Sequence, residues 1–286
     1  MKIETILVTG AGLMGRGIVE VAANAGYRVW WSDLAPEIVN KSLDAIRDSV
    51  ARRVAKNKIT ADDGEKILAI LAEKVSVAAS LEDGREADLA IEAVPEKPEL
   101  KSGLLAKLGA ACKQEALIVS NTSTLSITGL AAHSGRPEQF MGMHFFSPVP
   151  VMSLVELIRG VRTADETFAA VREAAVRMGK EPVAAPDSPG FIVNRILLLA
   201  MNEAFHLVAL GADPKDVDQA MRLGCNHPMG LLELGDYTGL DVVAAALESM
   251  HAATGDAKFK PCVYLQKLVE AGLLGRKTGR GVYPYE

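Results

Sequence analysis

A histidine and a glutamate flank a proline-rich turn in residues 141–157. His144 lies near the end of one apolar segment, and Glu156 lies in the next, beyond Pro148 and Pro150. Both segments are predicted to be strands, because they contain few polar residues. If the chain reverses at the prolines, the carboxylate returns beside the imidazole, fixes its tautomer and favours its charged form. Such a pair can serve as a general base near neutral pH, although isolated pairs of this kind are more often structural.

A glycine-rich loop directly follows the first predicted strand, residues 3–9. Residues 10–15, Gly-Ala-Gly-Leu-Met-Gly, match the G-x-G-x-x-G fingerprint, and an apolar pattern typical of a helix follows them. The first glycine permits a tight turn, the second lets the backbone approach a pyrophosphate, and the third allows close helix–strand packing. The pyrophosphate would lie at the positive end of the helix. The residues expected to bind a dinucleotide here are Gly10, Gly12, Leu13, Met14 and Gly15.

An acid ends the second predicted strand, residues 27–33. Asp33 follows the first glycine by roughly the 20 residues at which an acid binds the ribose 2′-hydroxyl in dinucleotide-binding domains. A carboxylate there would repel a 2′-phosphate. The sequence therefore favours NAD over NADP as the cofactor.

The composition is that of a globular protein large enough for two domains. The 286 residues are 49% hydrophobic and 23% charged, and the net charge of −5 gives no support for a nucleic-acid partner. The three cysteines lack metal-type spacing, and so small a number fits a reducing compartment. No secretory leader precedes the first strand, and residues 191–210, the most apolar long segment, carry charged side chains. We therefore expect a soluble, cytoplasmic protein with no bound metal and no membrane span.

Strand and helix patterns alternate along the first two thirds of the chain. Residues 36–74 predict a helical pair, which is longer than a plain crossover needs. The alternation predicts an α/β fold, a Rossmann-type doubly wound and mostly parallel sheet with this helical-hairpin insertion. From residue 187 onward the pattern is helical only. We therefore predict an NAD-binding domain at residues 1–186 and an all-α substrate and dimerisation domain at residues 187–286.

Seven blocks of sequence carry a resemblance that covers essentially the whole chain. They are residues 10–17, 92–96, 120–123, 144–150, 189–195, 226–230 and 275–279. In composition and order they resemble the 3-hydroxyacyl-CoA dehydrogenase family, most closely its short bacterial members that act on 3-hydroxybutyryl-CoA. Seven blocks in the family's order are far more specific than any one of them.

The resemblance implies roles for individual residues. It implies that His144 is the catalytic base, that Glu156 orients it, that Ser123 touches substrate and cofactor, and that Asn194 helps to form the substrate site. Further positions are implied to contact the dinucleotide, namely Glu96, Lys101, Ser147 and Lys277. The family often has asparagine where this chain has Ser147. Serine keeps a donor and an acceptor there but has a shorter reach.

Two further features concern the CoA tail and the oligomeric state. Lys56 and Lys58 give the helical insertion a basic end that could meet a CoA phosphate, and a solvated helix end is an equally good interpretation. Leu223, Leu231 and Tyr237 belong to an apolar cluster in the helical domain, through which the resemblance implies a homodimer. The alternative is that these side chains pack only within the subunit.

The sequence therefore predicts an NAD-dependent enzyme that interconverts a short-chain (S)-3-hydroxyacyl-CoA and its 3-ketoacyl-CoA. One alternative is a dehydrogenase of the same fold that acts on a free hydroxy acid or sugar acid, as the gulonate and carnitine enzymes do. Another is a dinucleotide-binding protein without catalysis. The block of residues 144–150 and the basic insertion favour the thioester, and the intact set of His144, Glu156, Ser123 and Asn194 favours catalysis.

Overall fold

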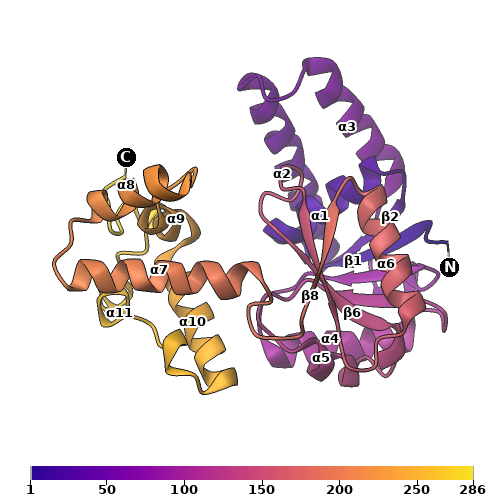
Figure 1. The fold of residues 1–286 in the computed structure, drawn as a ribbon. Coiled ribbons are helices and arrows are strands. Elements are labelled where there is room, and N and C mark those ends of the chain that lie inside the picture. The colour runs from indigo at the N-terminus through magenta and orange to yellow at the C-terminus, as the bar shows by residue number, and fades with distance from the viewer. Residues whose placement is uncertain (1, 286) are drawn as a thin grey trace. The chain divides into compact units, whose positions relative to one another are not determined.

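The computed structural model describes residues 2–285 and divides the chain into two compact units (Figure 1). The first unit is Met1–Asp187 and the second is Ser188–Glu286. The first contains every strand of the sheet, and the second is built from helices. The two are described separately below.

A single sheet organises the first unit. Among the described residues it has eight strands in the order β3-β2-β1-β4-β5-β6-β7-β8, all parallel to their neighbours except that β6 and β7 are antiparallel. From β1 the sheet grows through β2 and β3 in one direction. The chain then crosses back, and the sheet grows through β4 and β5 in the other direction, so the strand order reverses between β1 and β4. This confirms the predicted Rossmann-type doubly wound sheet. The strands are β1 Thr5–Thr9, β2 Arg28–Ser32, β3 Val75–Val77, β4 Leu89–Glu92, β5 Leu117–Ser120, β6 Phe140–Phe145, β7 Leu154–Arg159 and β8 Glu181–Ala185.

The central strands are mostly apolar because helices cover both faces of the sheet. Every residue of β1, β4 and β5 is buried, as expected for parallel strands between two helical layers. Helices α1 and α6 contribute to one buried cluster with β6, whereas α4 and α5 lie together on the other face (Figure 1). The helices are α1 Leu13–Asn24, α2 Pro36–Ala55, α3 Ala61–Lys74, α4 Pro98–Ala111, α5 Ile127–His133 and α6 Asp165–Arg177.

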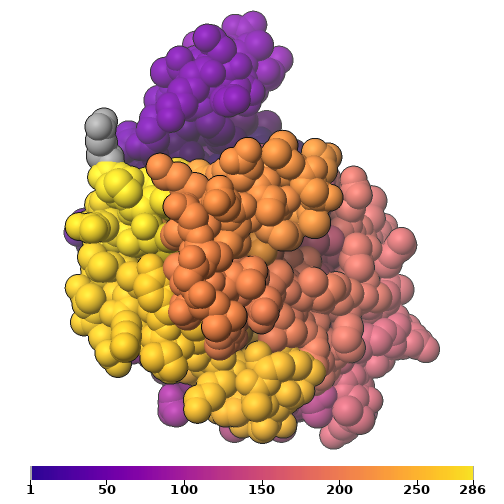
Figure 2. Space-filling model, turned by 60° about the vertical axis from the view of Figure 1, so that its left-hand side comes forward, coloured from indigo at the N-terminus to yellow at the C-terminus, as the bar shows by residue number. Residues whose placement is uncertain are grey.

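The predicted helical insertion is a hairpin of α2 and α3. The two helices pack along one another and extend beyond the sheet (Figure 1). Thr60 caps the start of α3, because its side chain accepts a hydrogen bond from the amide of Asp63. Figure 2 shows the hairpin, in violet, as a projecting element. Its connection carries Lys56 and Lys58, and both side chains are exposed.

The second unit confirms the predicted helical character of the C-terminal part. Its core is formed by apolar side chains of several helices and includes Phe205, Leu232, Leu247 and Leu265. Two isolated β-bridges near the C-terminus, centred on Arg280, are the described exception to the all-helical prediction. The helices are α7 Val193–Ala209, α8 Pro214–Cys225, α9 Leu231–Thr238, α10 Leu240–Thr254 and α11 Val263–Glu270.

None of the helices formed by residues 2–285 combines the length and the apolar character that crossing a bilayer requires.

Candidate active site

A cavity of about 1140 Å³ opens in the first unit at the carboxyl ends of the central strands. Its walls are the loops that follow β1, β2, β4, β5 and β6. Ligands of doubly wound sheets bind at this edge, where the strand order reverses. The cavity is lined by residues 9–14, 32–34, 93–96 and 144–147, together with side chains that include Asn121 and Ser123.

The glycine loop between β1 and α1 has the shape of a dinucleotide cradle. Gly10 has φ +106°, and a Cβ on it would lie 2.5 Å from the carbonyl oxygen of Ala93. A Cβ on Gly15 would collide with the carbonyl oxygen of Gly10, whereas one on Gly12 would meet nothing within 4 Å. The first turn of α1 carries no acidic residue, and its N-cap, Gly12, provides no side-chain cap. The backbone N–H groups of this turn are therefore available to a phosphate, and the loop fits a dinucleotide.

Asp33 connects the end of β2 to the glycine loop. One carboxylate oxygen accepts a hydrogen bond from the amide of Ala11 at 2.6 Å, and the other accepts one from the amide of Leu34 at 2.7 Å. The carboxylate is thus held on the cavity wall. Each oxygen has a second lone pair that can accept a hydrogen bond from a ribose hydroxyl.

His144 and Glu156 lie directly opposite each other on the antiparallel strands β6 and β7. The Nδ1 atom of His144 lies 2.8 Å from Oε2 of Glu156, so the reversal at the prolines brings the two side chains together as expected. His144 is 6% exposed and lines the cavity, whereas Glu156 is 1% exposed. A carboxylate on Nδ1 holds the proton there, so in the neutral ring Nε2 carries the lone pair that can accept a proton.

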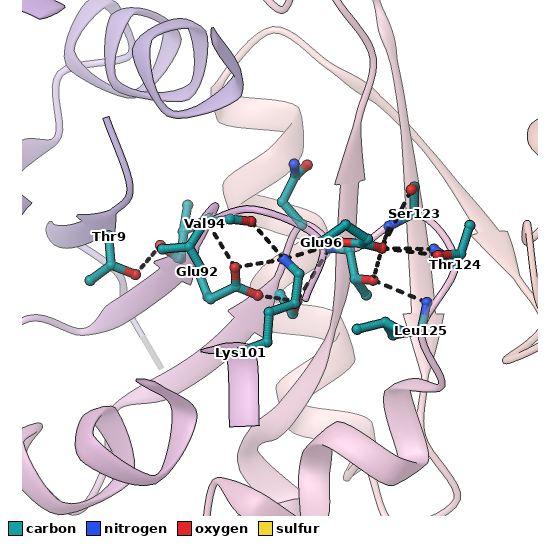
Figure 3. A network of polar contacts seen from close by, with 12 residues as sticks. Thr9, Glu92, Val94, Glu96, Lys101, Ser123, Thr124 and Leu125 are labelled. Atoms are coloured by element: carbon teal, nitrogen blue, oxygen red, sulfur yellow. Dashed lines mark hydrogen bonds and ion pairs between the residues drawn. The ribbon is translucent and has the colours of Figure 1, made fainter. Parts of the chain in front are cut away.

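Glu96 organises the loop that carries Ser123 (Figure 3). Its Oε1 atom accepts hydrogen bonds from the amides of Ser123 and Thr124 at 2.9 and 3.1 Å and from the hydroxyl of Thr122 at 2.5 Å. Burial disfavours the charged form of Glu96, but the ammonium of Lys101 and these hydrogen bonds outweigh it and lower the pKa of this carboxyl below its usual value. The loop is therefore held by an ionised carboxylate near neutral pH.

Lys101 lies beneath the cavity wall, not on it. Its side chain is 1% exposed, and its ammonium contacts Glu92 at 2.7 Å and Glu96 at 3.2 Å. The lysine does not line the cavity. Its ammonium contacts Glu96, which lines the cavity. The dinucleotide contact that the resemblance implies for Lys101 stays a prediction.

The remaining predicted residues have different surroundings. Ser147 lines the cavity after β6. Lys56 and Lys58 lie in the connection between α2 and α3 and form no part of the cavity wall. Two others belong to the second unit. Asn194 is in the first turn of α7, and Lys277 forms an ion pair with both carboxylate oxygens of Asp241 at 2.5 and 2.7 Å.

Two polar residues of the site were not predicted individually. Asn121 lines the cavity, and its Oδ1 atom accepts a hydrogen bond from the amide of Phe145 at 2.9 Å, next to His144. Glu92 is fully buried at the end of β4. A carboxylate that ends an otherwise apolar strand was the signal in the sequence, since such a group requires partners.

Comparisons with known proteins identify the family of this chain. Residues 5–188 match the family model for the NAD-binding domain of 3-hydroxyacyl-CoA dehydrogenase, and residues 190–285 match that for its C-terminal domain. A probable 3-hydroxybutyryl-CoA dehydrogenase of Bacillus subtilis is 43% identical over 287 residues, covering 100% of this chain and 99% of the relative. A 3-hydroxybutyryl-CoA dehydrogenase of Bradyrhizobium diazoefficiens is 44% identical, covering 99% and 96%.

Solved structures give the same result. The (S)-3-hydroxybutyryl-CoA dehydrogenase PaaH1 of Ralstonia eutropha superimposes with a TM-score of 0.93 at 42% identity, covering 100% of both chains. FadB2 of M. tuberculosis superimposes with a TM-score of 0.94 at 36% identity, also over 100% of both chains. Because both family models and full-length relatives match, this chain belongs to the 3-hydroxyacyl-CoA dehydrogenase family.

Proposed function

We propose that this enzyme interconverts (S)-3-hydroxybutyryl-CoA and acetoacetyl-CoA with NAD as its cofactor. The observation that carries the proposal is the His144–Glu156 pair on the wall of the cavity that also contains the glycine loop and Asp33. The names of the full-length relatives support a short-chain thioester as substrate. The first unit would hold the dinucleotide.

The proposed chemistry uses His144 as a general base. Glu156 keeps the Nδ1 proton in place, so Nε2 removes the proton of the substrate 3-hydroxyl while C3 loses a hydride. Bound NAD supplies the nicotinamide that accepts this hydride. In the opposite direction the imidazolium returns its proton to the oxygen that develops negative charge at C3. The buried carboxylate of Glu156 stabilises the imidazolium in both directions.

Other residues would bind and orient the two ligands. Ser123 is proposed to donate a hydrogen bond to the substrate oxygen, and Asn194 to complete the substrate site. Lys56 and Lys58, whose ammonium groups are exposed, are proposed to meet the phosphates of CoA. On the dinucleotide side, the proposed contacts are Gly10, Gly12, Leu13, Met14, Gly15, Asp33, Glu96, Lys101, Ser123, Ser147 and Lys277.

The first test is NADH oxidation with acetoacetyl-CoA, run beside free acetoacetate and with NADPH as the control cofactor. Rapid turnover with NADH and the thioester alone is expected. Turnover of the free acid alone would instead favour a hydroxy-acid or sugar-acid dehydrogenase. Binding of NADH without turnover of either substrate would favour a protein that binds the dinucleotide without catalysis.

Replacing Asp33 with asparagine is expected to weaken the preference for NADH over NADPH. A hydrogen bond to a charged group contributes about 1.5–3 kcal/mol, so the KM for NADH should rise about 10- to 100-fold. The repulsion of a 2′-phosphate should fall at the same time. Steady-state kinetics with both cofactors measures the ratio. A ratio equal to that of the wild type would remove Asp33 from the selection.

A homodimer formed through the second unit is also proposed. Leu231 of the predicted apolar cluster is buried within the unit, whereas Leu223 and Tyr237 are 78% and 54% exposed. Light scattering at micromolar concentration should give twice the chain mass of 30.4 kDa. A mass of one chain would contradict the dimer. The cytoplasmic location stays a prediction.

A further inference from the structure

We infer that Gly17 and Lys180 are positioning residues, which fix the turn between the two catalytic strands against the helix that begins the dinucleotide site. The turn is residues 148–152, between β6 and β7, and it directly follows Ser147. In the described part of the chain, the cavity wall includes neither Gly17 nor Lys180. The inference rests on the proposed function, because it takes His144 to be the general base and the start of α1 to bind the pyrophosphate.

The sheet by itself places the catalytic pair well away from the glycine loop. The strand of His144, β6, is separated from β1 by β4 and β5. At about 4.8 Å per strand, β1 and β6 lie roughly 14 Å apart. A dinucleotide held at β1 and a base held on β6 must nevertheless keep a fixed separation for hydride transfer. A contact between α1 and the turn after β6 joins the two parts without passing through the intervening strands.

Val149 forms this contact by packing onto Gly17. A Cβ on Gly17 would lie 2.6 Å from the Cβ of Val149 and 2.9 Å from its Cγ2, so the helix has room for this side chain only because residue 17 is glycine. Val149 is buried in the same cluster as Ile18 and Phe145. The dinucleotide fingerprint ends at Gly15, so pyrophosphate binding does not explain the glycine at position 17. The packing of the turn explains it.

Helix α1 therefore serves two parts of the site. Its first N–H groups, from Gly12 onward, face the expected pyrophosphate. Gly17 follows about 7.5 Å further along the helix axis, at about 1.5 Å per residue. A short and rigid helical segment thus connects the dinucleotide cradle to the turn that carries the catalytic strands.

Lys180 holds the same turn through its backbone. Its ammonium donates hydrogen bonds to the carbonyl oxygens of Val149 at 2.5 Å and Met152 at 2.8 Å. The carbonyl oxygen of Pro148 accepts hydrogen bonds from the amides of Val151 and Met152 at 2.9 and 3.0 Å, which close the turn. Hydrogen bonds from a charged donor are stronger than those between neutral groups. One side chain at the start of β8 therefore fixes both ends of the closed turn.

The charge of Lys180 also connects it to α1. The side chain is buried. Burial lowers the pKa of Lys180 below its usual value, while the nearby carboxylate of Glu20 favours the charged form. Glu20 is a buried residue of α1 and also pairs with Arg53 of α2 at 2.5 Å. The lysine that holds the turn is therefore attracted to the same helix on which Val149 packs.

The first test is a double-variant cycle of Gly17→Ala and Val149→Gly. Gly17→Ala alone should displace the turn and lower kcat with acetoacetyl-CoA about 10- to 100-fold, because a misplacement of about 1 Å costs about 100-fold. Val149→Gly removes the two atoms that the new Cβ would meet most closely. In the Val149→Gly background, Gly17→Ala should therefore change kcat by less than about twofold. A helix that is merely destabilised would not show this recovery.

Binding of ADP-ribose separates the turn from the dinucleotide loop. This probe contains the pyrophosphate and the adenine ribose but lacks the nicotinamide, so its expected contacts are the glycine loop and Asp33. Its Kd, measured by calorimetry, should stay within about twofold of the wild type in every variant. Gly129→Ala is the matched control, because an added Cβ on this exposed glycine of α5 would lie 3.6 Å from Ser126, an ordinary contact. It should change neither kcat nor the Kd for ADP-ribose.

Lys180→Met tests the turn from a different element of the fold. It should lower kcat about 10-fold, with the Kd for ADP-ribose unchanged. Lys113→Met is its control, since Lys113 also donates a hydrogen bond to a backbone carbonyl, that of Glu86 at 3.0 Å, but lines no part of the cavity. This control should behave like the wild type.

Hydrogen exchange of the amides of Val151 and Met152 reports on the turn without turnover. It should be faster in Gly17→Ala and in Lys180→Met than in the wild type and in both controls. Amide exchange and ADP-ribose binding therefore test the inference even if the wild type does not turn over acetoacetyl-CoA. That result would count against the proposed function alone.

Several results would overturn the inference. Equal losses of kcat from Gly17→Ala in both backgrounds would show that Gly17 does not act through Val149. A Kd for ADP-ribose that rises as much as kcat falls would assign Gly17 to the dinucleotide loop. Unchanged amide exchange, or an unchanged kcat in Lys180→Met, would show that these residues do not hold the turn. If Gly17→Ala does not fold, Lys180→Met is measured in its place, and failure of both to fold beside folded controls would assign both residues to the core alone.

Discussion

Replacing His144 with glutamine should lower kcat by about 10²–10⁴-fold, the range that a positioned general base contributes. Glutamine has a similar reach and can still form a hydrogen bond to Glu156, so the strands β6 and β7 should keep their register. It cannot accept the proton of the 3-hydroxyl. His144 lines the cavity from β6, whereas the glycine loop and Asp33, which are expected to bind the dinucleotide, follow β1 and β2. Binding of NADH should therefore be retained.

The measurement is kcat with acetoacetyl-CoA and NADH, together with the Kd for NADH from fluorescence. His133→Gln is the matched control, because His133 is an exposed residue at the end of α5 and lines no part of the cavity. It should behave like the wild type. Retention of near wild-type turnover by His144→Gln would remove this histidine from the mechanism.

Much of the fold was predictable because the central strands are short, mostly apolar segments bounded by loops. Every residue of β1, β4 and β5 is buried, and the polar ones stand at the strand ends, so the apolar centres separate these strands clearly from the helices that follow. The edge strands β3 and β8 were not predicted. Each has only one neighbour in the sheet, and β8 is largely exposed and contains Pro182. A proline is tolerated at a sheet edge, but it weakens the sequence pattern of a strand.

The site was predictable where chemistry depends on neighbours along the chain. The glycine loop lies within one short segment, and the pairing of His144 with Glu156 follows from a single reversal between adjacent strands. The surroundings of Lys101 and Glu92 could not be predicted in this way. Their interactions with Glu96 and Ser120 depend on β4, β5 and α4 meeting in space. The family resemblance implied a dinucleotide contact for Lys101 but gave no sign that its side chain is buried.

Replacing Glu156 with glutamine should cost nearly as much activity as the loss of His144. An amide can donate a hydrogen bond to Nδ1 where the carboxylate can only accept one, so the imidazole would adopt the wrong tautomer. Such a change beside a catalytic histidine costs up to about 10⁴-fold in kcat. The imidazolium would also lose its buried negative partner. Glu138→Gln, which alters an exposed ion pair with Arg162, should leave kcat unchanged.

The double variant His144→Gln/Glu156→Gln decides whether the two residues act as a unit. If Glu156 works only by orienting and stabilising the imidazole, its loss should matter little once His144 is absent, and the double variant should match His144→Gln in kcat. If the two losses multiply, Glu156 contributes independently of His144, for example by maintaining the antiparallel pair of β6 and β7. Thermal unfolding of the single variants separates these cases. If the two residues act as a catalytic pair, Glu156→Gln should lose kcat although its melting temperature stays well above the assay temperature. The chemistry depends on the position of one proton and not on the stability of the sheet.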